Sequence, residues 1–143
     1  MSVQAVLAPV FVQVALVFAL LFWMGRVRFA EVGADRVKIG DIALGQRNWP
    51  IRAQQAANAF SNQFELPVLF FALVPLALFT KKADLLFVIL AWIFVATRLV
   101  HAGITVTSNH VPNRFRAYAA GALVLLIMWI IFAIRIFAAP VGI

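Results

Sequence analysis

The sequence predicts an all-α integral membrane protein, a four-helix bundle that spans the bilayer. Of its 143 residues, 65% are hydrophobic and only 12% are charged, and the mean hydropathy is +1.02. A soluble core cannot bury that much apolar surface in so short a chain, and a disordered chain would be polar and charged. Four separate stretches are long and apolar enough to cross a bilayer, which takes about 20 residues per helix. Residues 1–143 are therefore expected to form a single transmembrane domain.

The four expected helices cover residues 3–24, 53–80, 85–106 and 117–138, and residues 25–52 form the one long loop. Proline occurs inside the first span at Pro9 and inside the second at Pro67 and Pro75. Pro50 is expected in the first turn of the second helix, with Asn48 as the N-cap, because proline and asparagine favour those positions.

Basic residues are concentrated in two of the three connections between the spans. The first connection, counted to Arg52, holds six Lys and Arg residues and the third holds two, whereas the second holds Lys81 and Lys82, offset by Asp84. Because basic loops are retained in the cytoplasm, the first and third connections are predicted to be cytoplasmic and both termini to lie outside. Arginines follow the first apolar stretch instead of preceding it, unlike in a typical signal peptide.

Composition excludes several classes of function. The chain has no cysteine, which rules out disulfides, thiolate metal sites and a cysteine nucleophile. Its two histidines and five carboxylates leave little material for a metal site. The net charge of +7 would suggest a nucleic-acid partner in a soluble protein, but in a membrane protein it records the topology. We therefore expect neither a metal nor a nucleic-acid partner.

Polar and ionisable side chains inside the spans are the most informative feature, because such groups are costly in lipid and mark function. Three of them in the second span are spaced four and then three residues apart, which places them on one helix face. The third and fourth spans repeat this kind of spacing, and one arginine follows the end of the first span. The eight residues are Arg28, Asn58, Asn62, Glu65, Arg98, His101, Arg114 and Tyr118.

The direction of each span places these residues at one depth. The second and fourth spans begin on the cytoplasmic side and the third ends there, so the cluster lies in the cytoplasmic half. The opposite half is nearly free of such groups apart from Arg135, whose long side chain can reach the interface. A one-sided cluster of arginines, a glutamate and asparagines suits a polar, anionic ligand that enters from the cytoplasm.

Purely structural roles for the same residues stay open. Asn58 and Asn62 can form hydrogen bonds between neighbouring helices, each worth about 1 kcal/mol or less. Glu65 can pair with Arg98 only to neutralise both charges, a role that does not exclude ligand binding. A satisfied buried histidine, a topology signal and an interfacial tyrosine are the ordinary explanations for His101, Arg114 and Tyr118.

The order and spacing of four short motifs resemble the MAPEG family, the membrane-associated proteins in eicosanoid and glutathione metabolism. The second span holds Asn-x-x-Glu at residues 62–65, the third holds Arg-x-x-His at 98–101, and Pro-x-Arg-x-x-x-Tyr occupies 112–118. A Gly-Arg-Val-Arg run at 25–28 closes the first span. The resemblance covers nearly the whole chain, in length and helix number as well as in motifs.

The resemblance implies a homotrimer of four-helix bundles among membrane lipids, with glutathione bound between neighbouring subunits near the cytoplasmic side. The protein would then be a glutathione-dependent transferase or peroxidase, and its lipophilic, electrophilic second substrate would arrive from the lipid. Asn62 and Glu65 would contact the tripeptide, and Arg114 would be the catalytic residue that stabilises its thiolate. The other positions of the cluster would line the binding site: Arg28, Asn58, Arg98, His101 and Tyr118.

The chain also departs from the well-studied glutathione-using members of that family. Asn58 and Ser61 stand where those proteins have arginines, Thr105 stands in place of a tyrosine, and Phe115 replaces a polar residue. In these departures the chain resembles the divergent bacterial branch, which implies a bacterial inner membrane as its location.

Two further classes of function stay open from the residues themselves. The protein could bind another anionic or lipid ligand without catalysing a conjugation. It could also be a membrane hydrolase or protease that uses Glu65, His101 and His110. The spacing from His101 to His110 matches no metal motif such as His-Glu-x-x-His.

Overall fold

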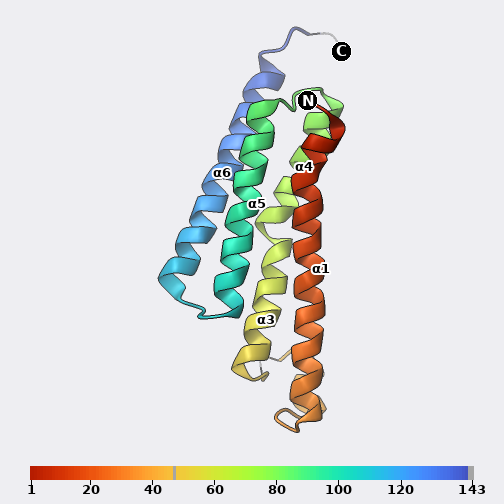
Figure 1. Ribbon diagram of the computed structural model, residues 1–143, viewed down its shortest axis with the longest axis vertical. Helices are drawn as coiled ribbons and strands as arrows, with labels where there is room; N and C mark the ends of the chain where they lie inside the picture. Colours follow the sequence, from red (N-terminus) through yellow and green to blue (C-terminus); the bar gives the residue numbers. More distant parts are fainter. Residues whose placement is uncertain (47, 142–143) are drawn as a thin grey trace.

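The computed structural model describes residues 1–46 and 48–141 as a bundle of long helices (Figure 1). Within these residues there is no strand. The helices are α1 (Val3–Gly33), the short α2 (Ile39–Ile42), α3 (Ile51–Ser61), the 3₁₀ helix η1 (Asn62–Phe64), α4 (Leu66–Phe79), α5 (Leu85–Val106) and α6 (Val111–Phe137).

Among the residues that the structure describes, four helical segments are long and apolar enough to cross a membrane: α1, the composite segment Ile51–Phe79, α5 and α6. The predicted fold class, an all-α membrane-spanning four-helix bundle, is therefore confirmed, and the chain is an integral multi-pass membrane protein. Both termini and the α4–α5 connection lie at one end, here called the termini end (Figure 1). The connection between α5 and α6 lies at the opposite end, called the α5–α6 end.

α1 continues nine residues beyond the expected end of the first helix, through much of the predicted loop. Between residue 24 and Gly33 there is no proline to stop the helix, and Val27 and Glu31, one turn apart, are both buried. At 31 residues α1 is about 46 Å long, longer than a hydrocarbon core of about 30 Å. Together with α3 it therefore extends past the α5–α6 connection (Figure 1).

The second span is broken, although one continuous helix over 53–80 was expected. α3 gives way to η1, and Glu65 lies between η1 and α4 with φ −99° and ψ −106°. Pro67 explains the break, because it has no N–H to donate and its ring clashes with the carbonyl four residues earlier. Buried Gln63 donates to the carbonyl of Ala59 (3.1 Å) and accepts from Nε2 of buried Gln13 in α1 (2.7 Å), which satisfies polar groups at the break.

The starts of α3 and α6 also differ from expectation. Pro50 is the N-cap residue of α3, and Asn48 does not cap it but donates to the carbonyl of Asp41 (2.7 Å). α6 begins at Val111, six residues before the expected start, with His110 as N-cap and Pro112 in the first turn. Hydropathy alone misses the start of α6 because Asn113, Arg114 and Arg116 interrupt the apolar run, although these residues are compatible with a helix.

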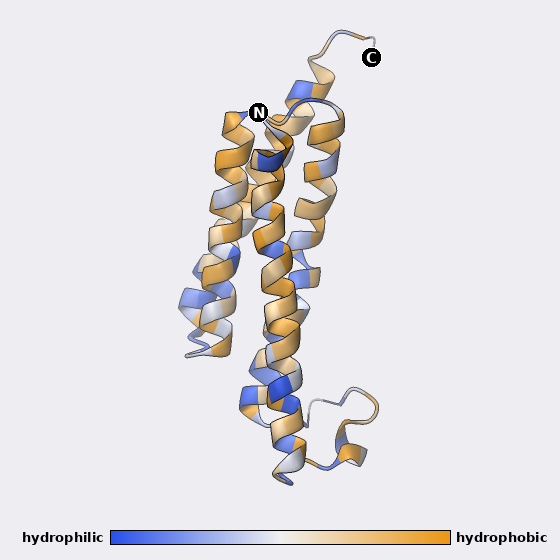
Figure 2. Ribbon diagram, turned by 45° about the vertical axis from the view of Figure 1, so that its right-hand side comes forward, coloured by the Kyte–Doolittle hydropathy of each residue, from blue (hydrophilic) through white to orange (hydrophobic). Residues whose placement is uncertain are grey.

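Apolar packing is concentrated toward the termini end. Phe70 and Phe94 pack there with their rings tilted by 31° and their centroids 4.9 Å apart, and Leu73 and Met128 belong to the same buried cluster. α5 and α6 approach closely at Gly121, where an added Cβ would lie 2.7 Å from the Thr97 hydroxyl. Figure 2 shows polar colours gathered around the α5–α6 end and the end of α1, while apolar colours dominate the shafts of the helices.

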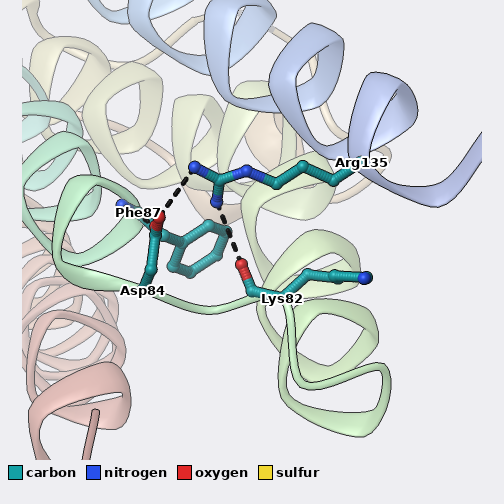
Figure 3. A network of polar contacts seen from close by, with 4 residues as sticks. All are labelled: Lys82, Asp84, Phe87 and Arg135. Carbon is teal, nitrogen blue, oxygen red and sulfur yellow. Dashed lines mark hydrogen bonds and ion pairs between the residues drawn. The ribbon is translucent and has the colours of Figure 1, made fainter. Parts of the chain in front are cut away.

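A polar network joins α5 to α6 at the termini end (Figure 3). Arg135 donates from Nη2 to the Asp84 carboxylate (2.7 Å) and from Nη1 to the carbonyl of Lys82 (3.2 Å). Asp84 also accepts from the backbone N–H of Phe87 and so caps α5. Arg135 is thus paired within the chain, in addition to lying near the end of its span.

Candidate functional site

A polar cavity of about 490 Å³ opens between the second span, α5 and α6, in the half of the bundle toward the α5–α6 end. Its volume lies within the range of small-molecule sites, about 300–1,000 Å³. Six of the eight predicted site residues are among its lining. The lining residues are Asn58, Ser61, Asn62, Glu65, His101, Val111, Arg114, Phe115 and Tyr118.

The second span supplies one wall of the cavity. Asn58 on α3 is oriented by Gln54, one turn earlier, whose Nε2 donates to the Asn58 side-chain oxygen (2.8 Å). Asn62 follows with helical backbone angles (φ −63°, ψ −18°), whereas Glu65 lies at the break itself, where the backbone leaves the helical conformation. The predicted shared face of these three residues is therefore present, although they do not belong to one regular helix.

Glu65 and Tyr118 connect the second span to α6 across the cavity. The Tyr118 hydroxyl donates to Oε2 of the exposed Glu65 (3.3 Å). The His101 ring of α5 lies beside Tyr118, with ring centroids 5.5 Å apart. Three spans therefore meet at this point, and Glu65 keeps acceptor capacity for a ligand.

Arg98 lies behind the lining and is fully buried. Its Nη2 donates to the main-chain carbonyl of Asn62 (3.2 Å), and its Cζ lies 5.6 Å from the centroid of the Tyr118 ring. Arg98 forms no salt bridge with Glu65 in this structure, so the expected structural pair between these two residues is not observed. Arg98 supports the wall of the cavity instead of facing its interior.

Arg114 brings a guanidinium to the cavity from the first turn of α6. Its Nη1 donates to the side-chain oxygen of Asn109 (2.6 Å), which orients the group. Asn109 has φ +50°, a left-handed conformation that asparagine tolerates better than most residues. Arg114 and Glu65 are the two residues of the lining with a full charge at neutral pH, and they come from different spans.

Arg28 is not among the lining residues of the cavity in the single chain. Its Cζ lies 4.7 Å from the centroid of the Trp49 ring, a cation–π contact between α1 and the loop before α3. The resemblance places the ligand between neighbouring subunits, so the role of Arg28 in the site of a neighbour stays a prediction.

Three lining residues were not among the predicted site residues: Ser61, Val111 and Phe115. Helical spacing would have found them. Ser61 lies three residues after Asn58, while Val111 and Phe115 precede Tyr118 by seven and three residues, so they share its face. A prediction based on polar and ionisable side chains does not include Val111 and Phe115, because both are apolar.

The residues of a hydrolytic site are not brought together. His110 caps the N-terminus of α6, where its Nδ1 accepts from the backbone N–H of Asn113 (3.4 Å), and it does not line the cavity with Glu65 and His101. Among residues 1–46 and 48–141, no group of three or more His, Cys, Asp or Glu side chains could hold a metal ion.

The fold and the cavity define a four-span membrane protein with a polar site recessed among its helices. The chain belongs to the MAPEG family, whose family model matches residues 6–134. This match confirms the resemblance seen in the four short motifs. Neither a curated protein nor a solved structure matches the chain.

Proposed function

We propose that this MAPEG protein is a glutathione-dependent transferase or peroxidase that acts on lipophilic electrophiles. The observation that carries the proposal is the convergence of Asn58, Asn62, Glu65, His101, Arg114 and Tyr118 on one cavity of about 490 Å³. These side chains offer amide hydrogen bonds, one carboxylate, one guanidinium and one hydroxyl, which complement a zwitterionic peptide with a thiol. Family membership supports the same ligand.

Arg114 is the proposed catalytic residue. A free thiol has a pKa near 8.5, and only the thiolate is a good nucleophile. A guanidinium beside the sulfur favours the thiolate and raises the reactive fraction at neutral pH. In a conjugation the thiolate sulfur forms a bond to the electrophilic carbon, and the bonding pair to the leaving group departs with that group. Asn109 keeps the Arg114 guanidinium oriented for this role.

The other polar residues are proposed to hold the peptide. Glu65 accepts hydrogen bonds from the ligand's ammonium group, and Tyr118 keeps the carboxylate aligned for this contact. Asn58 and Asn62 bond to the peptide amides and carboxylates. Arg98 acts indirectly, because it fixes the backbone of Asn62.

A homotrimer is proposed as the assembly, with Arg28 of one subunit completing the site of the next. In the single chain the cavity is open on one side, which would expose Glu65 and Arg114 to lipid. A closed cyclic assembly would cover these charged groups. Native mass spectrometry in mild detergent is expected to show trimers. A protein that is monomeric throughout would contradict this assembly.

The orientation of the bundle is proposed from its charges. The α5–α6 end carries the basic connections, so it faces the cytoplasm and both termini lie outside. In a bacterial inner membrane, glutathione would then reach the cavity from the cytoplasm. Cysteine substitutions labelled by an impermeant maleimide report this directly, since the native chain has no cysteine. A cysteine at Ser2 should label in intact cells, and one at Asn113 only after lysis.

Isothermal titration of glutathione into the purified protein in nanodiscs tests the proposed ligand. We expect saturable binding that is weakened by Asn62→Ala and left unchanged by Asn113→Ala, an exposed asparagine at the same end that does not line the cavity. Conjugation of a chlorodinitrobenzene then tests the proposed reaction. No binding at millimolar glutathione would overturn the proposal.

A second candidate is a MAPEG protein that binds its ligand without conjugation. The cavity lining favours this candidate at two positions, because Asn58 and Ser61 offer no charge for a ligand carboxylate. Binding of glutathione with wild-type turnover no faster than the uncatalysed reaction would establish it. Saturable binding of another anionic or lipid ligand in place of glutathione would establish it for that ligand.

A further inference from the structure

A second cavity, of about 300 Å³, lies between the end of α1, the loop that follows it and the start of α3. Its lining includes Trp23, Arg26, Glu31, Arg36 and Arg52, and it shares no residue with the cavity beside Arg114. Three arginines from three separate stretches of chain therefore surround one hollow. The proposed glutathione site makes no use of them.

The cavity lies at the depth of the lipid headgroups. From Val3 to Trp23, α1 rises about 30 Å, which matches the thickness of the hydrocarbon core. Arg26 is three residues further along the helix, about 4.5 Å beyond that boundary. Trp23 occupies the position that tryptophan favours, at the edge between hydrocarbon and headgroups. With the hydrocarbon core starting at Val3, Arg26 lies at the level of the lipid phosphates, and Arg52 lies near it because its Cζ is 5.1 Å from the Trp23 ring centroid.

The charge of the cavity is positive, with three guanidiniums and one carboxylate. Glu31 is buried and accepts from Nη1 of Arg36 (3.2 Å), so one arginine is already paired. Arg52 lies over Trp23, with its Cζ 5.1 Å from the ring centroid. Arg26 and Arg52 donate no hydrogen bond to another described residue, so their N–H groups are free to bind an anion.

We propose that this cavity binds the phosphate group of an anionic phospholipid. The planar fork of a guanidinium matches two phosphate oxygens, and two such forks, from Arg26 and Arg52, face one hollow here. Arg36 adds a third positive charge, held in place by Glu31. The lining carries a net positive charge, and a zwitterionic headgroup, which has no net charge, would leave it unbalanced. This charge favours an anionic lipid. A bound headgroup would link α1, the long loop and α3 at the membrane surface.

Native mass spectrometry of the detergent-solubilised protein tests this site. Phosphatidylglycerol and phosphatidylcholine with the same acyl chains are added in parallel, and inorganic phosphate is added in a third sample. We expect phosphatidylglycerol adducts to outnumber phosphatidylcholine adducts by tenfold or more. The two lipids share the phosphodiester and the tails and differ in the net charge of the headgroup. Equal binding would therefore show that the site does not select an anionic lipid and would overturn the proposal.

Variants of the lining arginines test whether the preference for phosphatidylglycerol arises from this cavity. The double variant Arg26→Gln and Arg52→Gln is expected to lose the preference, whereas Arg116→Gln, an exposed arginine at the same end, keeps it. If the double variant is unfolded, Arg52→Lys serves instead: it keeps the charge, loses the fork and is expected to weaken the preference several-fold. A preference for phosphatidylglycerol that survives in these variants would show that the lipid binds elsewhere and would overturn the proposed site. Saturable binding of inorganic phosphate that phosphatidylglycerol does not displace would show that the cavity binds free phosphate and not a lipid headgroup.

Discussion

Arg98 in the middle of α5 donates a hydrogen bond to the main-chain carbonyl of Asn62, 36 residues earlier, at the break in the second span. The break frees backbone groups in the part of the chain that crosses the membrane, where water cannot satisfy them. A fully buried guanidinium supplies one of the missing donors. The contact therefore ties α5 to the position from which Asn62 and Glu65 enter the cavity.

Replacement of Arg98 by alanine is expected to destabilise the protein without ligand. The change leaves the Asn62 carbonyl without this donor and opens a cavity where a large side chain was fully buried. A hydrogen bond to a charged group contributes about 1.5–3 kcal/mol. Thermal unfolding in detergent should show a clearly lower midpoint, with Arg116→Ala as the exposed control. An unchanged midpoint for Arg98→Ala would contradict the supporting role of this residue.

Glu65→Gln is expected to leave the stability of the ligand-free protein nearly unchanged. Glu65 is exposed, and Tyr118 can donate equally well to the amide oxygen of glutamine. The loss of the charge should weaken glutathione binding by about tenfold or more, since a hydrogen bond to a charged group contributes about 1.5–3 kcal/mol. Unfolding and titration of the same preparation separate the two effects. A drop in midpoint as large as that of Arg98→Ala would show that the carboxylate has a structural partner after all.

Arg114→Ala is expected to lower kcat by on the order of 10²-fold or more, with a smaller effect on the binding of glutathione. The guanidinium stabilises the charge on sulfur, and loss of one main electrostatic stabiliser costs about that much. Thiolate absorbance followed against pH should show a higher thiol pKa in the variant. Arg116, two positions on, points to another face of α6 and is the matched control. Equal turnover of wild type and Arg114→Ala would eliminate the proposed catalytic role.

The ion pair at the termini end should make stability depend on pH in the acidic range. The hydrogen bond from Arg135 holds the pKa of the Asp84 carboxyl below its ordinary value of 3.8. A lowered folded-state pKa adds stability that is fully present well above pH 3.8 and is lost as the pH falls through the lowered value. The side chain of Asp84 is half exposed, so the contribution is at most about 1 kcal/mol.

Asp84→Asn tests this pair, because asparagine can still cap α5. The difference in unfolding midpoint between wild type and variant is expected to be constant from about pH 5 to 7 and to shrink toward zero at lower pH. Asp84→Ala should be less stable than Asp84→Asn at every pH, because it also removes the cap. A difference that does not change with pH would argue against the ion pair as its source.

The break in the second span could be predicted only in part from the local sequence. Pro67 was visible in the sequence, and a proline inside a helix predicts a kink or a break. The apolar run nevertheless continued past it, so one helix was expected. What makes a break tolerable in lipid is a set of side-chain hydrogen bonds: Gln63 and Arg98 donate to backbone carbonyls beside the break, and Gln13 donates to the Gln63 side chain. Two of these residues lie on other spans, about 50 residues before the break and 36 after it.

The candidate site was predictable to the extent that it follows helix periodicity and depth. Asn58, Asn62 and Glu65 were expected on one face and do line the cavity, as does Arg114. Arg98 was expected in the lining and lies behind it, because the rotation of α5 about its axis turns this side chain toward the break. The spacing of residues in the sequence does not indicate this rotation, because packing between helices sets it.

The sequence by itself determined the number of spans, their approximate positions and the polar layer that they share. These features depend on the length of apolar runs and on spacings of three and four residues, both of which are local. The tertiary structure decided the pairs Arg98–Asn62 and Tyr118–Glu65, and it directed Arg28 toward Trp49 instead of the cavity. Each of these contacts joins residues 21 to 53 positions apart. Their partners depend on how each helix is rotated and offset against its neighbours, which only the packed bundle specifies.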